Sequence, residues 1–197
     1  VRLAWTLETG GAVEGPACVE RDRVYFGCMD EELYAVEGAL GRRIWSIKVG
    51  TGNMKPLASD GLVFHSTYNG KLVAVDSGRG EIVSTAQLGL PSGERDEIWK
   101  SSLAVQKGKV YVGTKSRLRC LAYPGWSELW AFDPGGKIFG TPVVEGGRVV
   151  FGSWNGKVIS LEAGTGRVNW EVQKKSEMRT SVLVVGDRVV ACCSDGF

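Results

Sequence analysis

Histidine is scarce in this sequence, and the common metal-binding and phosphate-binding patterns are absent. His65 is the only histidine among 197 residues, so any Ser/His/Asp or Cys/His device would have to use it. None of the five cysteines stands in a CxxC or Cys/His pattern with the spacing of zinc ligands. The glycine-containing stretches match neither GxGxxG nor GxxxxGK followed by Ser or Thr. The sequence therefore gives no support for a zinc site or a phosphate-binding loop.

An excess of charge of either sign is absent, and so are long apolar runs. Lys and Arg number 24 against 22 Asp and Glu, which leaves a net charge of +2 and no reason to expect nucleic acid or a strongly acidic partner. A transmembrane helix needs a run of about 20 apolar residues, and no apolar run in this sequence approaches that length. We therefore expect no membrane-spanning segment.

The compartment is not settled by the sequence. Five cysteines, an odd number, cannot all pair within one chain, which favours small buried thiols and slightly favours a cytoplasmic location. The first residues, VRLAWTLETG, lack the charged start and apolar stretch of a signal peptide. Because the chain does not begin with Met, a leader trimmed from a periplasmic protein stays open as the alternative.

What the sequence does have is a repeat and many glycines spread along it. The 28 glycines are about twice ordinary usage and indicate regularly spaced turns. A motif of apolar strand, small residue, turn and strand recurs about every 40 residues, which changes the whole fold assignment. It begins at Val24, Val63, Val110, Val149 and Val189. A second mark keeps the same step, at Trp5, Trp45, Ser84, Trp130 and Trp170, where only Ser84 departs.

Each repeat divides into four short β-type runs joined by turn residues. In the clearest repeat we expect strands at residues 142–145, 148–154, 157–162 and 168–172. Asn155-Gly156 separates the second run from the third, and Asn69-Gly70 and Asp195-Gly196 occupy the same place. Asn-Gly between two β runs predicts a type I′ turn, in which both central residues have positive φ. No segment shows a sustained helical period, so no helix is expected.

Four antiparallel strands repeated about every 40 residues are typical of a β-propeller blade. The sequence thus predicts an all-β fold with four complete blades and parts of a further one. The Trp of each fourth strand is expected to pack between adjacent blades. These structural docking residues are Trp5, Trp45, Trp130 and Trp170.

The ends of the repeats carry a family resemblance. LEAGTGRVNW, VEGALGRRIW and VDSGRGEIVS resemble the A-x-x-G-x-x-x-W tryptophan-docking motif. That motif marks the pyrroloquinoline-quinone-like repeats of quinoprotein alcohol dehydrogenases and of BamB-like outer-membrane assembly lipoproteins. The resemblance implies the propeller fold, but its repeats are shared by enzymes, assembly factors and sensor domains, so it does not fix the function.

The expected organisation is one propeller domain or propeller segment. Its repeat units are residues 11–50, 51–89, 90–135, 136–175 and, in part, 176–197, preceded by a fourth-type strand at residues 3–7. A closed five-blade ring would lack one strand and expose two unpaired edges. We therefore favour a segment of a seven- or eight-blade ring, completed by other residues or another chain, with self-association through open edges. A five-blade ring with a reduced last blade is the alternative.

Two features that suggest chemistry have simpler structural interpretations. Cys192-Cys193 is similar to the adjacent-cysteine disulfide of quinoprotein dehydrogenases, but both residues fall in positions where the other repeats use small side chains. His65 falls in an apolar position of the second strand, which favours a packed core residue. No match to the family's calcium ligands or catalytic aspartate was found. We expect no cofactor, no metal and no catalytic residue.

The third repeat is longer by about seven residues, and the excess forms a mixed-charge loop at residues 91–99. Loops carry binding in such folds, and Trp and Arg are frequent contact residues. The candidate partner-binding residues are Arg95, Asp96, Glu97 and Trp99. The alternative is that Trp99 only caps the widened blade. A local basic face is a further candidate, although a solvated strand face is the simpler interpretation; its members are Lys107, Lys109, Lys115, Arg117 and Arg119.

The favoured function is a non-catalytic scaffold that binds a protein partner through its blade loops, as the BamB-like resemblance implies. One alternative is a segment of a quinone-dependent dehydrogenase. The other is a sensor propeller attached to a signalling enzyme.

Overall fold

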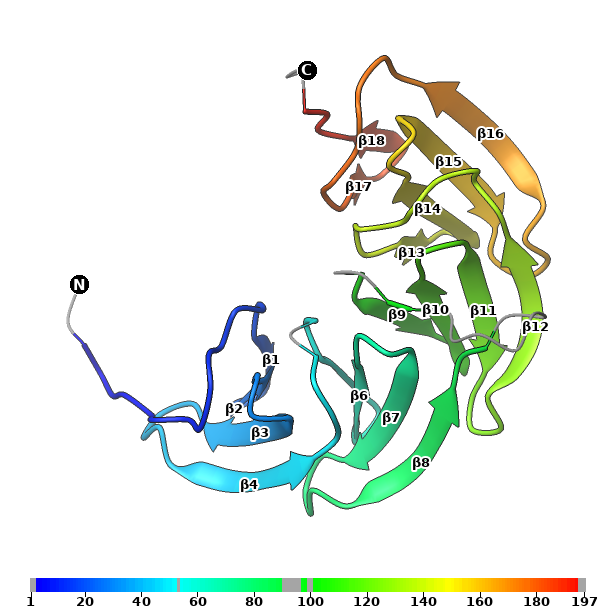
Figure 1. Ribbon diagram of the computed structural model, residues 1–197. Coiled ribbons are helices and arrows are strands. Elements are labelled where there is room, and N and C mark those ends of the chain that lie inside the picture. The colour runs from blue at the N-terminus through cyan, green and yellow to red at the C-terminus, as the bar shows by residue number, and fades with distance from the viewer. Residues whose placement is uncertain (1–2, 53, 90–96, 99–100, 195–197) are drawn as a thin grey trace. The chain divides into compact units, whose positions relative to one another are not determined.

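The computed structural model describes residues 3–52, 54–89, 97–98 and 101–194, and all of its regular structure is β-strand (Figure 1). The chain forms two compact units, Val1–Arg95 and Asp96–Phe197, and each is described by itself. Among the described residues there is no helix, as the sequence predicts.

The first unit holds two four-stranded antiparallel sheets, each with its strands in chain order. One sheet consists of β1 (Cys18–Glu20), β2 (Arg23–Gly27), β3 (Glu32–Glu37) and β4 (Arg43–Lys48). The other consists of β5 (Leu57–Ser59), β6 (Leu62–Ser66), β7 (Lys71–Asp76) and β8 (Ile82–Gln87).

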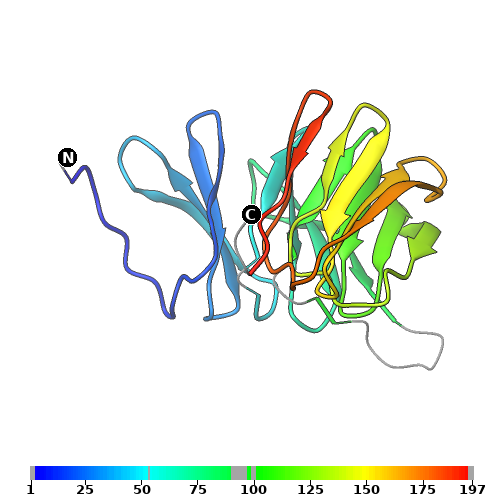
Figure 2. The same ribbon diagram turned by 90° about the horizontal axis from the view of Figure 1, so that it is seen from above.

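The second unit holds two more such sheets and a two-stranded one. The third sheet consists of β9 (Leu103–Gln106), β10 (Lys109–Gly113), β11 (Leu118–Ala122) and β12 (Ser127–Phe132). The fourth consists of β13 (Val143–Glu145), β14 (Arg148–Gly152), β15 (Lys157–Glu162) and β16 (Val168–Gln173). The hairpin of β17 (Leu183–Val185) and β18 (Arg188–Val190) lies beside the fourth sheet (Figure 2).

Position within the sheet decides which strands are apolar. The second and third strands are buried along nearly their whole length, whereas the fourth strands are mostly exposed. A strand covered on both faces needs apolar side chains on both, which explains the near-continuous runs such as LVAV in β7. The all-β architecture of four-stranded antiparallel blades predicted from the repeat is confirmed.

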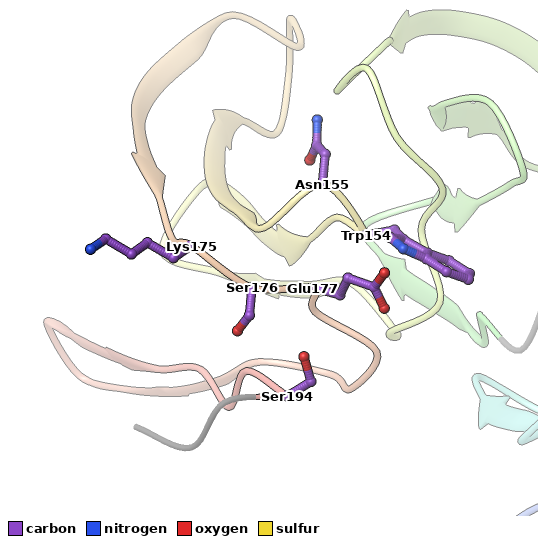
Figure 3. A pocket seen from close by; sticks show the side chains of 6 residues that line it. All are labelled: Trp154, Asn155, Lys175, Ser176, Glu177 and Ser194. Carbon is purple, nitrogen blue, oxygen red and sulfur yellow. The ribbon is translucent and has the colours of Figure 1, made fainter.

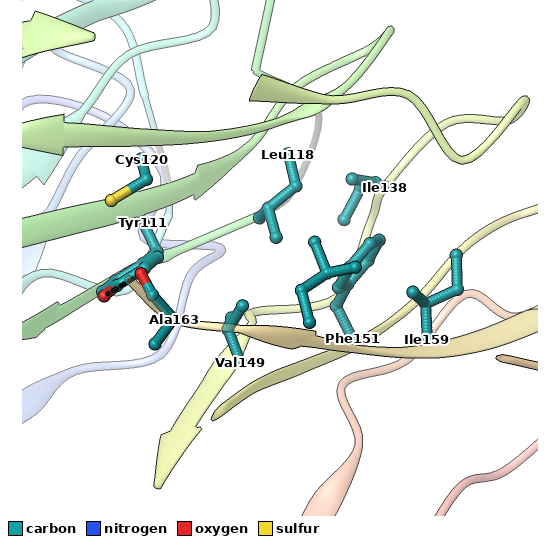
Figure 4. Close-up of a cluster of buried hydrophobic side chains, with 9 residues drawn as sticks. Tyr111, Leu118, Cys120, Ile138, Val149, Phe151, Ile159 and Ala163 are labelled. Carbon is teal, nitrogen blue, oxygen red and sulfur yellow. Dashed lines mark hydrogen bonds between the residues drawn. The ribbon is translucent and has the colours of Figure 1, made fainter. Parts of the chain in front are cut away.

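The core lies between successive sheets. In the second unit, one buried cluster combines Tyr111 and Leu118 of the third sheet with Val149 and Phe151 of the fourth (Figure 4). The Tyr111 hydroxyl donates to the carbonyl oxygen of Ala163 over 3.1 Å, so its one polar group is satisfied inside the cluster. In the first unit, an equivalent cluster joins the sheets of β1–β4 and β5–β8.

The recurring Trp position keeps one register on the fourth strand. Trp45 pairs with Ala35, and Trp170 pairs with Ser160 in the same way. Ser84, the departing residue, pairs with Ala74 at the equivalent place.

Trp45 lies on the turn before the fourth strand of the next sheet. Its indole N–H donates to the Ser77 carbonyl over 3.0 Å, and its ring covers Gly80. Gly80 has a φ of +73°, and a Cβ there would come within 2.6 Å of the ring, so glycine is required twice over. Trp5 on Gly38 and Trp130 on Ala163 repeat the hydrogen bond at 2.8 and 3.2 Å.

Trp170 differs from the other three. It is half-buried against an apolar cluster that includes Val158 and Met178, and it has no such turn beneath it among the described residues. Docking of Trp170 between blades therefore stays a prediction.

Two local predictions are wrong. Residues 3–7 form no strand, because a strand needs a hydrogen-bonded neighbour and no described segment pairs with them. Cys192, expected to be a buried small residue, is exposed and Cys193 is half-buried, whereas Cys18, Cys28 and Cys120 are buried.

The type I′ turns occur at a different connection from the one predicted. At Asn69-Gly70 only Gly70 has positive φ. The Gly70 N–H donates to the Thr67 carbonyl, so the turn is a four-residue loop from Thr67 to Gly70 with the glycine at its last position. Positive φ at both central residues occurs instead between first and second strands. Those turns are Asp60-Gly61, Lys107-Gly108 and Gly146-Gly147.

Candidate functional site

One backbone hydrogen bond recurs at the turn between the second and third strands. The second residue of each turn donates its N–H to a carbonyl in the loop that leads into the same repeat, and we call these two residues a loop pair. In the first unit the pairs are Met29 with Ala12 (3.0 Å) and Tyr68 with Thr51 (3.1 Å). In the second unit they are Lys115 with Glu97 (2.7 Å), Trp154 with Lys137 (2.8 Å) and Ser194 with Glu177 (3.1 Å).

The side chains of the loop pairs are under no such constraint. A small residue precedes each turn member, for example Thr114 before Lys115 and Ser153 before Trp154, but the turn member itself changes chemistry from repeat to repeat. Lys115 and Glu97 form an ion pair at 3.6 Å. A constant backbone frame with changing side chains is typical of a surface used for recognition.

Trp154 is the most unusual side chain among these pairs. It is half-buried, and its ring lies 4.7 Å from that of Phe139 at an interplanar angle of 46°. Lys137 Nζ lies 5.2 Å from the ring centroid and the guanidinium carbon of Arg179 lies 4.9 Å from it. Cations at these distances are attracted by the ring quadrupole.

Glu177 holds Arg179 in place over the indole. Nε and Nη2 of Arg179 donate to Oε2 of Glu177 over 3.0 and 2.7 Å. These bonds, with a further one from the Trp154 side chain, hold the pKa of the Glu177 carboxyl below its ordinary value. Glu177 is therefore ionised and already engaged at neutral pH.

A polar pocket of about 500 Å³ opens beside Trp154 and is called the Trp154 pocket below (Figure 3). Its lining residues are Trp154, Asn155, Lys175, Ser176, Glu177 and Ser194.

Two residues fix the loops beside the Trp154 pocket. Asn155 is fixed by a 2.8 Å bond from its Nδ2 to the Pro134 carbonyl. Gly156 has a φ of +84°, and a Cβ there would come within 2.7 Å of the Lys174 carbonyl. The close approach of the two loops therefore depends on glycine at this position.

Of the sequence-predicted partner-binding residues, only Glu97 is described. It belongs to the loop pair with Lys115, and the adjacent Ile98 is fully buried. Arg95, Asp96 and Trp99 lie outside the described residues.

Two members of the predicted basic face have carboxylate partners. Arg119 forms an ion pair with Glu128 at 2.5 Å, and Lys115 pairs with Glu97. These pairs offset the positive charge of Lys115 and Arg119 only, so the basic face stays a prediction.

The remaining candidates for chemistry do not converge. His65 is 1% exposed, and removal from water lowers its pKa to about 4. Cys192 and Cys193 are free thiols. Within the described part of the chain, no group of three or more His, Cys, Asp or Glu side chains is placed to hold a metal ion, and no helix is long and apolar enough to cross a membrane.

Sequence analysis missed Trp154 and Arg179. The signal for Trp154 was present, because the residue after the small one in each repeat runs Met29, Tyr68, Lys115, Trp154, Ser194. Arg179 carries no comparable signal, since its role depends on the path of the loop between β16 and β17.

Comparison with known proteins supports the repeat assignment. The chain matches the family model described as "Outer membrane protein assembly factor BamB" in two overlapping stretches, residues 2–116 and 68–196. A protein of that description from Yersinia pestis is 27% identical over 205 residues, covering 93% of this chain and 51% of the relative. Another, from Burkholderia pseudomallei, is 26% identical over 140 residues, covering 68% of this chain and 34% of the relative. The chain thus spans about half or less of the length of these relatives.

Solved structures show the same fold. The crystal structure of BamB from Moraxella catarrhalis matches with a TM-score of 0.81 at 19% identity, over 98% of this chain and 61% of that one. The computationally designed Ika8 protein matches with a TM-score of 0.76 at 16% identity, over 91% of this chain and 55% of that one. At these identities the likeness establishes the blades and nothing about the site.

Proposed function

The chain belongs to the outer membrane protein assembly factor BamB family, and from this premise we propose that it is a non-catalytic scaffold for outer membrane protein assembly. It acts by binding a protein partner through loops at the ends of its blades. The relatives' description supports the assembly role, and the loop geometry supports the mode of binding.

The observation that carries this proposal is the set of loop pairs in the second unit. Backbone hydrogen bonds fix the two loops of each pair, so the side chains are presented on a preorganised frame. Preorganisation lowers the entropy that a loop loses when a partner binds. Trp154 and Arg179 are the side-chain types that most often dominate binding energy at protein interfaces.

The extended loop of the third repeat belongs to the same proposal. Glu97 is the loop-pair residue of that repeat, equivalent to Lys137 and Glu177 in the following ones. Arg95, Asp96 and Trp99 precede or follow it directly in the chain, so we include them among the partner contacts.

Site-specific photo-crosslinking in the producing organism tests the proposal. The natural full-length protein would carry a photoreactive side chain at position 154 or 99, or at Val172 as a control. Val172 lies on β16 and is 47% exposed, so it is as accessible as a loop but belongs to a strand. We expect a discrete crosslinked partner from positions 154 and 99 and none from position 172. Equal crosslinking from all three positions, or none from the loops, would contradict loop-mediated binding.

A double variant of the extended loop complements the crosslinking experiment. Replacing Arg95 and Trp99 together by Ala is expected to leave the melting temperature almost unchanged while reducing partner recovery and the level of assembled outer membrane proteins. A large fall in melting temperature would instead identify Trp99 as a packing residue.

A further inference from the structure

Glu177 joins two side chains that come from different parts of the loop surface. Its Oε2 accepts hydrogen bonds from Nε and Nη2 of Arg179 over 3.0 and 2.7 Å, and the carboxyl also accepts one from the Trp154 side chain. Figure 3 shows the Glu177 carboxylate beside the nitrogen-bearing edge of the Trp154 indole. The guanidinium carbon of Arg179 lies 4.9 Å from the centroid of the same ring. The three side chains thus contact one another in pairs, and we call them the Glu177 cluster.

The main chain of Glu177 is fixed independently of its side chain. Its carbonyl oxygen accepts the loop-pair hydrogen bond from the Ser194 N–H over 3.1 Å, and the next residue, Met178, is buried in an apolar cluster. The carboxylate is therefore attached to a fixed backbone, whereas the long, exposed Arg179 side chain has many rotamers to lose when a partner binds. An acceptor that already restricts this side chain lowers the entropy lost on binding.

The Glu177 cluster contributes little to folding by itself. The side chains of Arg179 and Glu177 are 62% and 41% exposed, and ion pairs at such positions add little net stability because water competes for both charges. The loop pairs do not need the cluster either, since their hydrogen bonds use backbone atoms. What the cluster sets is the orientation of Trp154 and Arg179, whose side-chain types most often carry binding energy at interfaces.

We infer that Glu177 is a positioning residue of the partner-binding surface: its carboxylate orients the Arg179 guanidinium over the Trp154 indole, and affinity for the partner depends on that orientation. Glu177 acts through these two side chains, so its role requires no contact of its own with the partner. This inference rests on the proposed function, because it names the residue that presents two of the proposed contact side chains.

Nuclear magnetic resonance tests the positioning without a partner. In the natural full-length protein, isotope-labelled at Trp and Arg, the Arg179 Nε–H and the Trp154 indole N–H are identified by their loss in Arg179→Lys and Trp154→Phe. At neutral pH we expect Glu177→Gln to speed exchange of the Arg179 Nε–H with water at least about tenfold, because its charged acceptor is gone. Unchanged exchange in Glu177→Gln would overturn the inference.

A pH profile separates positioning from a general loss of structure. The charged group that faces Glu177 is the Arg179 guanidinium, and Lys137 Nζ lies 5.2 Å from the centroid of the same indole ring. As the pH falls below the ordinary pKa of a glutamate, protonation of Glu177 should shift the Trp154 indole signal and the Arg179 Nε–H signal together. In Glu177→Gln neither signal should show this titration. A Trp154 signal that titrates equally in both proteins would contradict the role of Glu177.

Glu171→Gln is the matched control. Glu171 forms an ion pair with Lys157 at 3.0 Å and its side chain is 38% exposed, so this substitution removes the same charge from a comparable pair on β16. It should leave the Trp154 and Arg179 signals unchanged. Equal changes from the two substitutions would mean that net charge, and not the Glu177 cluster, moves the signals.

Photo-crosslinking from position 99 tests whether binding depends on the cluster, because a probe there leaves all three side chains in place. Glu177→Gln should weaken capture of the crosslinked partner about tenfold, the effect of losing one charge-assisted hydrogen bond. Glu171→Gln should have no comparable effect. Once Trp154 and Arg179 are both replaced by Ala, Glu177→Gln should add no further loss, since the side chains through which it acts are gone.

The two proposals fail in distinguishable ways. If no partner crosslinks from any loop position, the scaffold proposal is wrong, and the resonance experiments still decide whether Glu177 orients the two side chains. If a partner crosslinks but Glu177→Gln captures it as well as the wild type does, the loop surface is used and the positioning inference is wrong.

Discussion

Replacing His65 by Phe should remove a pH dependence of folding that the wild-type chain owes to a single imidazole. His65 lies on β6 in the register position that Phe26 and Phe151 occupy in other repeats. It is 1% exposed, and burial lowers its pKa from 6.5 to about 4. The folded state therefore keeps the imidazole neutral, while the unfolded chain protonates it near its ordinary pKa.

The sign and size follow from proton linkage. Between pH 6.5 and about 4 the unfolded state binds a proton that the folded state does not, so the unfolding free energy falls as the pH falls through this window. The contribution of the buried neutral imidazole to the unfolding free energy is complete above pH 6.5 and is lost by about pH 4. Since one pKa unit corresponds to about 1.4 kcal/mol, the loss is about 3 kcal/mol. That is a substantial fraction of the stability of a small domain.

The measurement is urea unfolding followed by Trp fluorescence at several values of pH between 7 and 4, for wild type and for His65→Phe. Phe is larger than the imidazole, which already lies close to Gly27, so the comparison uses the slope of stability with pH and not the absolute stability. Carboxylates titrate in both proteins, so the difference between the two profiles isolates the imidazole.

Proton NMR gives an independent reading. Because His65 is the only histidine, its ring signal can be followed without assignment, and in the folded chain it should titrate near pH 4. Parallel stability profiles for the two proteins, or a ring signal that titrates near 6.5, would refute the burial argument.

Two further predictions address packing and chemistry. Gly80→Ala and Gly61→Ala both place a side chain at positive φ, but only Gly80 lies under the Trp45 ring, so its loss of stability in urea unfolding should exceed that of Gly61→Ala by about 1 to 3 kcal/mol. Equal losses would mean that the indole moves aside at little cost. With pyrroloquinoline quinone and calcium added, the chain should reduce no dye when given alcohols or sugars, and quinone-dependent reduction above background would revive the dehydrogenase alternative.

The repeat made the blades predictable because each strand's place in the sheet sets its composition. Strands buried on both faces must be apolar throughout, as in β6 and β7, and the turns between them need glycine at fixed offsets. The spacing of Trp45, Ser84 and Trp170 likewise gave their common register on the fourth strand.

Local predictions were wrong where the structure depends on a neighbouring strand or on side-chain hydrogen bonds within a turn. The apolar and polar pattern of residues 3–7 suits a strand, but no described neighbour pairs with it. The Asn69-Gly70 dipeptide fits a two-residue turn, yet Thr67 accepts the Gly70 N–H and its hydroxyl donates to Asn69 Oδ1 over 2.6 Å, which closes a longer loop. Side-chain hydrogen bonds of this kind are not visible in a dipeptide pattern.

The site was harder to predict because it combines loops that are distant in sequence. Lys137 and Trp154 meet across a turn and a preceding loop, and Arg179 reaches the same ring from the loop after β16. The sequence pointed instead to residues 91–99, because an inserted, charged segment can be recognised in the sequence. A cation placed above an indole can be recognised only in the structure.

The loop pairs also explain why side chains at the blade ends can change without loss of the fold. The bond from Trp154 N–H to the Lys137 carbonyl uses backbone atoms only, and Ser194 makes the same bond to Glu177 with a side chain a fraction of the size. Blade geometry therefore requires a residue at this position but does not require a Trp. The Trp154 indole and the two cations near its ring are not needed for this backbone frame. We propose that the Trp at position 154 serves contact with a partner, which is why that position is the first to probe.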